Sequence, residues 1–183
     1  LGIETDKISK SVKTDTGKVI VFNHRTKEYR GWKHFVKIIQ KLREQRQDFK
    51  VFCSMIDPAG QAIVKKSFDD ISFFDYDGPS DRNEYIRKLE NCRFGFHGGS
   101  RWAMSSQDGL CKGVPYVFEI GNETGELFGH KMETGFKTTD EAIDLFNRML
   151  DDNDWRNKQS QLALEHCSSV HTWKNRVVPF NSM

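Results

Sequence analysis

The sequence has no long apolar run, no close pair of cysteines and little net charge. Each of these absences excludes a class of protein function. No apolar stretch approaches the length of a membrane-spanning helix, and nothing at the beginning resembles a signal peptide. The net charge of +2 at pH 7 is too small to indicate nucleic-acid binding by itself, although it permits anionic ligands. We therefore expect a soluble globular domain without a membrane span.

The four cysteines are widely spaced and form no CxxC pair. Because Cys53 and Cys92 lie in or beside predicted strands, buried free thiols are favoured over disulfides or a metal site. The sequence also contains no Walker loop, no His/Cys cluster with metal-ligand spacing and no Ser-His-Asp order. These features predict a cytoplasmic protein without a metal site.

What the sequence does contain is enough apolar residues for one ordinary domain. Of its 183 residues, 37% are hydrophobic and 30% are charged. Short apolar strands alternate with segments of helical periodicity, which is typical of a parallel sheet covered by helices on both faces. The predicted strands cover residues 18–22, 50–55, 71–74, 94–97 and 114–118.

Capping residues mark where several predicted helices begin. Asp81 is expected to cap one helix, Thr139 or Asp140 the next, and Asp154 the last. Residues 119–137 are rich in glycine and are expected to be irregular.

The best organised stretch, RFGFHGGSRWAMSSQDGLCKGVPYVFE, is predicted to form strand, glycine turn, helix and strand. Gly98 and Gly99 let the backbone turn tightly and approach a ligand closely. Ser100 is a candidate N-cap, and Gly113 is expected to end the helix in a left-handed conformation. A helix that begins after a glycine turn presents unpaired N–H groups, so this stretch is a candidate anion site.

In parallel α/β sheets, ligands bind beyond the carboxyl ends of the strands. This rule places the loops after Phe22, Phe74 and Phe96 on one rim. In the first of these loops, Arg25 and Arg30 can grip adjacent phosphates with paired N–H groups. The alternative interpretation is a solvated basic loop.

Five more residues on this rim are candidates for ligand contact. Asp108 could accept hydrogen bonds from two ribose hydroxyls, although the sequence alone favours an exposed helical acid. His97 ends the central strand, where ligand contact is favoured over catalysis. Tyr76, Asp77 and Gly78 could flank a nucleobase or form only a turn.

Four segments match, in order, motifs of one enzyme family. LGIETDK resembles the segment that leads through the hinge between its two domains, and RTKEYRG resembles its R-x-x-x-x-K-G loop, with Arg30 in place of lysine. DGLCKGVP resembles its E-A-x-A-x-G-x-P segment, with Asp108 as the acid, and VHTWKNRV resembles its F-S-W-x-x-x-A helix. The family is the retaining, nucleotide-sugar-dependent glycosyltransferases of group 1, which have two Rossmann-like domains (the GT-B fold).

This resemblance implies an α/β fold, with a Rossmann-like parallel sheet that has helices on both faces and forms one half of a GT-B enzyme. Residues 1–17 would form the interdomain linker, 18–170 the nucleotide-sugar-binding domain and 171–183 the C-terminal crossing segment. The chain would be the donor-binding half of a hexosyltransferase that acts with retention. It would need a nucleotide-sugar donor and an N-terminal acceptor-binding domain as partners, but no cofactor or metal.

The resemblance also implies a role for each candidate. Arg25 and Arg30 would be catalytic, because they neutralise the diphosphate as it leaves. Gly98, Gly99 and Ser100 would donate hydrogen bonds to phosphate or sugar. Asp108 would bind ribose, and the loop from Tyr76 to Gly78 would flank the base.

Within this family, the sequence resembles the DNA α-glucosyltransferases of tailed phages. The likeness lies in Arg25-Thr26 and in the run Thr124-Gly125-Glu126. This likeness suggests UDP-glucose as a candidate donor and nucleic acid as a candidate acceptor.

Two departures from the family keep other functions open. The family's first acid lies eight positions before its second, and that position is Ser100 here. Asp108 is also one carbon shorter than the usual glutamate. An inert nucleotide- or phospholigand-binding module of the same fold is therefore one alternative. A sugar-nucleotide epimerase is another, which would require further acids and histidines from a second half.

Overall fold

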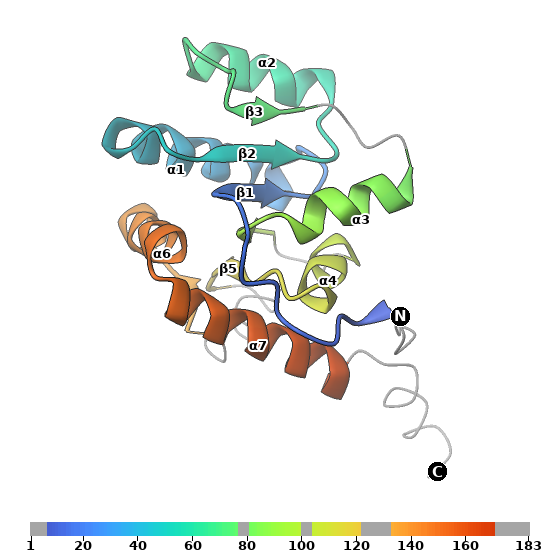
Figure 1. The fold of residues 1–183 in the computed structure, drawn as a ribbon. Helices are drawn as coiled ribbons and strands as arrows, with labels where there is room; N and C mark the ends of the chain where they lie inside the picture. Colours follow the sequence, from blue (N-terminus) through green and yellow to red (C-terminus); the bar gives the residue numbers. More distant parts are fainter. Residues whose placement is uncertain (1–6, 77–80, 100–103, 122–132, 171–183) are drawn as a thin grey trace.

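The computed structural model describes residues 7–76, 81–99, 104–121 and 133–170. Six strands form one sheet, and all its pairings are parallel (Figure 1). The strands are β1 (Val19–Phe22), β2 (Lys50–Cys53), β3 (Phe74–Asp75), β4 (Phe94–His97), β5 (Tyr116–Glu119) and β6 (Gly135–Phe136). Their order across the sheet is β3-β2-β1-β4-β5-β6. The direction of winding therefore reverses between β1 and β4, where α/β sheets of this kind bind ligands.

Helices cover both faces of the sheet, as predicted (Figure 1). They are the 3-10 helix η2 (Glu28–Arg30) and the α-helices α1 (Trp32–Gln45), α2 (Pro58–Ser67), α3 (Arg82–Glu90), α4 (Met104–Cys111), α6 (Thr139–Asp151) and α7 (Asn153–Val170). One apolar cluster joins one face of the sheet to α1, α2 and α6. A second cluster joins the other face to α3, α4 and α7. The predicted α/β fold is confirmed.

The strands are apolar on both sides because both faces are covered. In β1, Ile20 and Phe22 belong to the cluster with α1, whereas Val21 between them belongs to the opposite cluster. All four cysteines are buried free thiols, as predicted for Cys53 and Cys92. Burial raises the pKa of both these thiols.

The third predicted strand was placed too early in the chain. Ile71 and Phe74 are joined by a turn hydrogen bond of 3.0 Å from the Phe74 N–H to the Ile71 carbonyl. Asp70 stabilises this turn by accepting a bond of 2.8 Å from the Ser72 N–H. The apolar residues before Phe74 therefore pack from a turn, and the strand itself begins at Phe74.

The prediction for residues 119–137 was wrong at its end, where β6 adds a sixth strand. The next helix is capped by Thr138, and not by Thr139 or Asp140. Its hydroxyl accepts from the Glu141 N–H, while the Glu141 carboxylate accepts from the Thr138 N–H, forming a capping box. The last helix begins at Asn153, one residue before the predicted cap.

The segment before β1 runs along α4 and α7 (Figure 1). The Ser9 N–H donates to the Cys111 carbonyl at 2.8 Å, and Arg156 donates to the Lys13 carbonyl at 2.6 Å. Most of the LGIETDK and VHTWKNRV segments and the Thr124-Gly125-Glu126 run lie outside the described residues. Within the described ranges, every helix is too short or too polar to cross a membrane.

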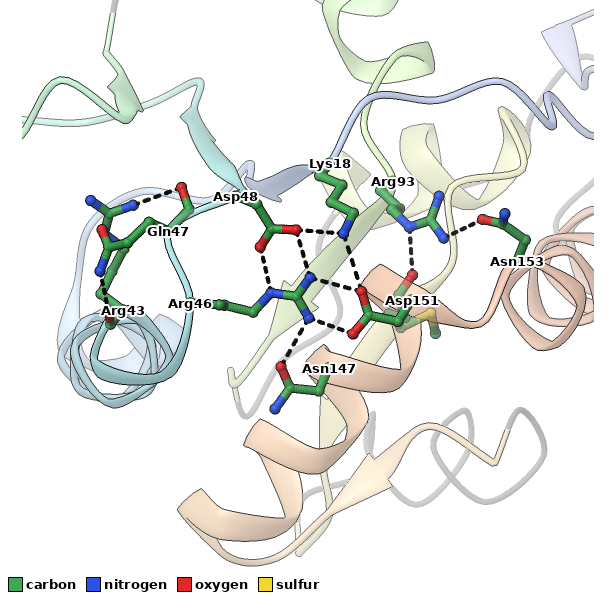
Figure 2. A network of polar contacts seen from close by, with 10 residues as sticks. Lys18, Arg43, Arg46, Gln47, Asp48, Arg93, Asn147, Asp151 and Asn153 are labelled. Atoms are coloured by element: carbon green, nitrogen blue, oxygen red, sulfur yellow. Dashed lines mark hydrogen bonds and ion pairs between the residues drawn. The ribbon is translucent and has the colours of Figure 1, made fainter.

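A network of charges closes the amino-terminal edge of the sheet (Figure 2). Arg46, just past the end of α1, donates to Asp48 at 2.6 Å and to Asp151 of α6 at 2.6 Å. Lys18 bridges the same two carboxylates, at 2.5 and 3.1 Å. These ion pairs join the ends of α1 and α6 to the starts of β1 and β2.

Candidate functional site

The loop after β1 and the turn after β4 pack backbone against backbone at the reversal point of the sheet. Gly31 has φ of 75°, and a Cβ atom there would lie 2.8 Å from the Gly98 Cα atom. A Cβ atom on Gly99 would lie 3.3 Å from the Cα atom of Arg30. Glycine therefore allows the predicted phosphate loop, Arg25–Gly31, to lie directly on the glycine turn.

Helix α1 begins at this contact and points its N-terminus toward the rim. Gly31 is its N-cap and supplies no side-chain acceptor, and the first turn of α1 contains no acid. The positive end of the helix dipole is therefore not neutralised by a residue of that turn. Together with the glycine turn, this arrangement favours an anionic ligand.

The basic side chains of the loop differ in their surroundings. Lys27 forms an ion pair of 2.6 Å with Asp57. The Arg25 side chain is exposed and forms no ion pair or hydrogen bond with any residue in the described ranges. Arg30 is half-buried, and its guanidinium lies 5.3 Å from the centre of the Tyr29 ring. Arg25 is thus a cation at the rim to which the described residues provide no counter-charge.

Two buried histidines, His24 after β1 and His97 at the end of β4, lie in contact with each other near this loop. His97 Nδ1 lies 3.1 Å from His24 Nε2 and 2.9 Å from the Ser106 hydroxyl. His24 Nδ1 lies 2.9 Å from the Ser105 hydroxyl. The histidine that ends β4 and the histidine that follows β1 are thereby tied to the first turn of α4.

Both imidazoles are neutral at pH 7. Burial, together with the nearby charge of Arg30, lowers the pKa of His97 to about 4. Burial also holds the pKa of His24 well below its usual value, with His97 and Arg30 as the next causes. The sequence predicted His97 as a ligand contact, and the structure places its side chain fully inside the protein.

Asn23 fixes the position of α4 relative to the sheet. Its buried amide nitrogen donates to the Ser105 carbonyl of α4 at 2.7 Å and to the Tyr116 hydroxyl of β5 at 2.7 Å, and the Tyr85 hydroxyl lies 3.1 Å away. The Tyr116 ring lies between two glycines, since a Cβ atom on Gly95 or Gly109 would come within 2.3 or 2.4 Å of it. Glycine is therefore required at 109, where the resembled motif has alanine.

Helix α4 ends as predicted. Gly113 has φ of 72°, the left-handed conformation expected of it. Its N–H donates to the Leu110 carbonyl at 3.0 Å, and the Val114 N–H donates to the Gly109 carbonyl at 2.9 Å, which is a Schellman motif. Ser100, the expected N-cap, lies outside the described residues.

Asp108 lines a pocket of about 360 Å³ at the carboxyl rim. Its side chain is 19% exposed and accepts two hydrogen bonds from Arg82, at 2.8 and 3.2 Å. Ser54, which follows β2, is 9% exposed, and its hydroxyl has no hydrogen-bond partner among the described residues. The other residues that line the pocket are Met55, Asp81, Tyr85 and Ser105. Asp108 is therefore a partly buried, ion-paired group, unlike a solvated helical acid.

Tyr76 lies apart from this cluster, just past the edge strand β3. Its ring stacks on Phe74 at 5.6 Å and is partly buried against the core. Asp77 and Gly78, predicted with it as a base-binding loop, lie outside the described residues. The structure thus brings together Arg30, Gly98, Gly99 and His97, with Arg25 in the same loop as Arg30, and it places Asp108 at the neighbouring pocket.

The sequence interpretation did not single out Arg82, Ser54 or His24. Each carries a positional signal that was available. His24 lies two positions past β1, Ser54 directly follows β2, and Arg82 directly follows the N-cap Asp81. Residues at these positions lie on the carboxyl rim of a parallel sheet.

No protein-family profile matches the sequence, and the comparison with curated proteins gives no significant match. Solved structures do match. One is HepE from Anabaena in complex with UDP-glucose, with a TM-score of 0.77 at 11% identity, covering 100% of this chain and 56% of HepE. Another is the C-terminal domain of LpcC, a group 1 glycosyltransferase from Francisella tularensis, with a TM-score of 0.71 at 13% identity, covering 94% of this chain and 100% of that domain.

TarM from S. aureus, in a complex that contains UDP, matches with a TM-score of 0.74 at 10% identity, covering 96% of this chain and 38% of TarM. The chain therefore spans well under half of TarM and just over half of HepE. These matches show that it has the fold of one domain of a GT-B glycosyltransferase, similar to the C-terminal domain of group 1 enzymes.

Proposed function

We propose that this chain is the donor-binding domain of a retaining glycosyltransferase, which moves a sugar from a nucleotide-diphosphate sugar to an acceptor. The observation that supports this most is the contact between the Arg25–Gly31 loop and the Gly98–Gly99 turn at the start of α1. It gathers Arg30, a glycine turn and a helix N-terminus at one point of the rim, and Arg25 belongs to the same loop. A diphosphate is the ligand chemistry that suits this combination.

In this proposal, the nucleoside occupies the pocket beside Asp108 and the diphosphate lies across the β1–β4 reversal point. The Asp108 carboxylate accepts hydrogen bonds from ribose hydroxyls. Arg25 and Arg30 stabilise the negative charge that develops on the diphosphate when the sugar leaves. Because these cations are fixed in the protein, the proposed transfer needs neither a divalent metal nor a cofactor.

The partner in this proposal is a second, acceptor-binding domain that completes the cleft. UDP-glucose is the first donor to test, because HepE binds it. Nucleic acid is an acceptor class to test, because the sequence resembles phage DNA α-glucosyltransferases.

Calorimetric titration of this chain with UDP, UDP-glucose and GDP-sugars tests the proposal. We expect saturable binding that weakens at least about a hundredfold in Arg25→Ala/Arg30→Ala, since each lost contact to a charged group is worth about 1.5–3 kcal/mol. Lys65→Ala/Lys66→Ala is the matched control, because it removes the same charge from the exposed end of α2. Absence of binding by the wild type at millimolar nucleotide, or equal loss in both double variants, would contradict the proposal.

The second candidate is an inert nucleotide- or phospholigand-binding module. The non-acidic residue at position 100 supports it, because that position faces the sugar in the resembled enzymes. Binding of UDP without turnover of any UDP-sugar by the complete protein would favour this candidate. Transfer with an α-linked product, observed by NMR at the anomeric carbon, would favour the enzyme.

A further inference from the structure

Arg82 is held at the mouth of the Asp108 pocket by the way α3 begins. Asp81 caps this helix by accepting a hydrogen bond of 2.9 Å from the Glu84 N–H. The cap fixes the first turn, from which the Arg82 side chain extends to α4. There it meets Asp108 through two N–H···O bonds, one to each carboxylate oxygen, at 2.8 and 3.2 Å.

This paired geometry differs from an ordinary surface ion pair. A single exposed ion pair contributes little to stability, because solvent screens the attraction and both side chains lose conformational entropy. A guanidinium that donates to both oxygens also fixes the plane of the carboxylate. Arg82 is 66% exposed, whereas Asp108 is only 19% exposed, so the exposed partner orients the buried one.

The oriented carboxylate retains acceptor capacity. Each carboxylate oxygen has two lone pairs, and Arg82 uses one on each. Two acceptor sites are left, and Asp108 lines the pocket with Ser54, whose hydroxyl has no hydrogen-bond partner among the described residues. A pair of neighbouring hydroxyls, as on ribose, matches two acceptors held in one plane.

We propose that Arg82 is a positioning residue that orients Asp108 to bind the ribose diol of the nucleotide. This inference rests on the proposed function, and it assigns to α3 a part in selecting ribonucleotides. Arg82 itself need not touch the ligand. Its effect should appear only with ligands that have the 2′- and 3′-hydroxyls.

The test compares UDP with 2′,3′-dideoxyuridine diphosphate by calorimetry on the wild type, Arg82→Gln and Arg87→Gln. Arg87 is the matched control, since it is an exposed arginine of the same helix that does not line this pocket. We expect the wild type to prefer UDP by about tenfold, a difference of one or two hydrogen bonds. Arg82→Gln should remove most of this preference and leave binding of the dideoxy ligand unchanged, whereas Arg87→Gln should alter neither.

Two further variants separate orientation from charge and folding. Arg82→Lys retains the charge without the two-pronged geometry, so it should lose the preference as Arg82→Gln does. Arg82→Gln/Asp108→Asn should prefer UDP no less than Asp108→Asn alone, because both changes remove the same interaction. An unchanged thermal midpoint of Arg82→Gln would show that folding is intact.

Several outcomes would overturn the inference. Tighter UDP binding by Arg82→Gln would mean that Arg82 competes with ribose for Asp108. One such outcome is that Arg82→Gln weakens the binding of both ligands equally, and another is that it changes affinity as much as Arg87→Gln does. Either result would mean that Arg82 acts only through its positive charge and does not orient Asp108. A wild type that binds both ligands equally would refute this inference alone, whereas a wild type that binds neither would refute the proposed function as well.

Discussion

The two edges of the sheet use polar residues in opposite ways. At the amino-terminal edge, Lys18, Arg46, Asp48 and Asp151 neutralise one another in a closed network (Figure 2). Arg46, together with Lys18, lowers the pKa of Asp151 to about 2. The four charges of this network are paired within the protein and require no ligand.

At the carboxyl-terminal edge, the charges and hydrogen-bonding groups are not all satisfied by the protein. Arg25 has no counter-charge among the described residues, and the Ser54 hydroxyl and the Asn23 amide oxygen have no partner among them. Two histidines are buried there in neutral form. In the proposed function, the amino edge serves stability, whereas the carboxyl edge keeps bonding capacity for the nucleotide.

The largest effect on stability is expected from replacing a glycine at the carboxyl edge, compared with a glycine at the amino edge. Gly31→Ala places a side chain in the left-handed region and 2.8 Å from the Gly98 Cα atom. We expect a loss of about 2–4 kcal/mol in the free energy of unfolding, from backbone strain and overpacking. Gly17→Ala, just before β1, meets nothing closer than 3.6 Å and should change stability by less than about 0.5 kcal/mol. Denaturant unfolding measures both, and similar losses would contradict the close backbone contact.

Acid should affect the two edges in different pH windows. His97 has a pKa of about 4 in the folded protein, below its unfolded value of about 6.5, so the unfolded state binds more protons between these values. Stability should therefore be complete above pH 6.5 and fall by roughly 2–3 kcal/mol as the pH drops toward 4. Asp151, with its pKa lowered to about 2, should lose its contribution only below about pH 4.

Unfolding free energies measured from pH 7.5 to 3 would reveal these windows. The His97→Gln variant should flatten the upper part of the profile, whereas Asp151→Asn should leave that part unchanged. A wild-type profile that is flat from pH 6.5 to 4.5 would show that the histidines are not buried as neutral groups.

The smallest expected effect concerns the amino edge alone. Arg46→Met removes the bonds to Asp48 and Asp151 but leaves Lys18 between these carboxylates. We expect a loss of about 1–2 kcal/mol in stability, because the network is partly exposed, and no change in affinity for UDP. Thermal unfolding and calorimetry on the same sample measure the two quantities. A tenfold loss of affinity would mean that the two edges are not independent.

Much of this fold could be predicted from the sequence because its strands are short, apolar and separated by helical periodicity. β1, β2, β4 and β5 were found close to their places for this reason. β3 and β6 have two residues each, too few for a periodicity to register. The cap at Thr138 lies one residue before those predicted, since several of the neighbouring residues could serve as caps.

The site could be predicted only in part. The carboxyl-end rule places Arg25 and Gly98 on one rim from their order in the chain, whereas the role of Asp108 was inferred from the family resemblance. Contacts such as that of Arg82 with Asp108 join residues 26 positions apart on two helices. Such pairings depend on how the helices pack, which no local pattern encodes. The same holds for the bond between His24 and His97, which lie 73 positions apart.

The most direct test of the account is a crystal structure of this chain with UDP. We predict the diphosphate between the Arg25–Gly31 loop and the Gly98–Gly99 turn, with the ribose hydroxyls within hydrogen-bonding distance of Asp108. UDP bound elsewhere, such as in the groove that Ile8 and Lys10 form with Leu164 of α7, would contradict the assignment of the carboxyl edge as the donor site.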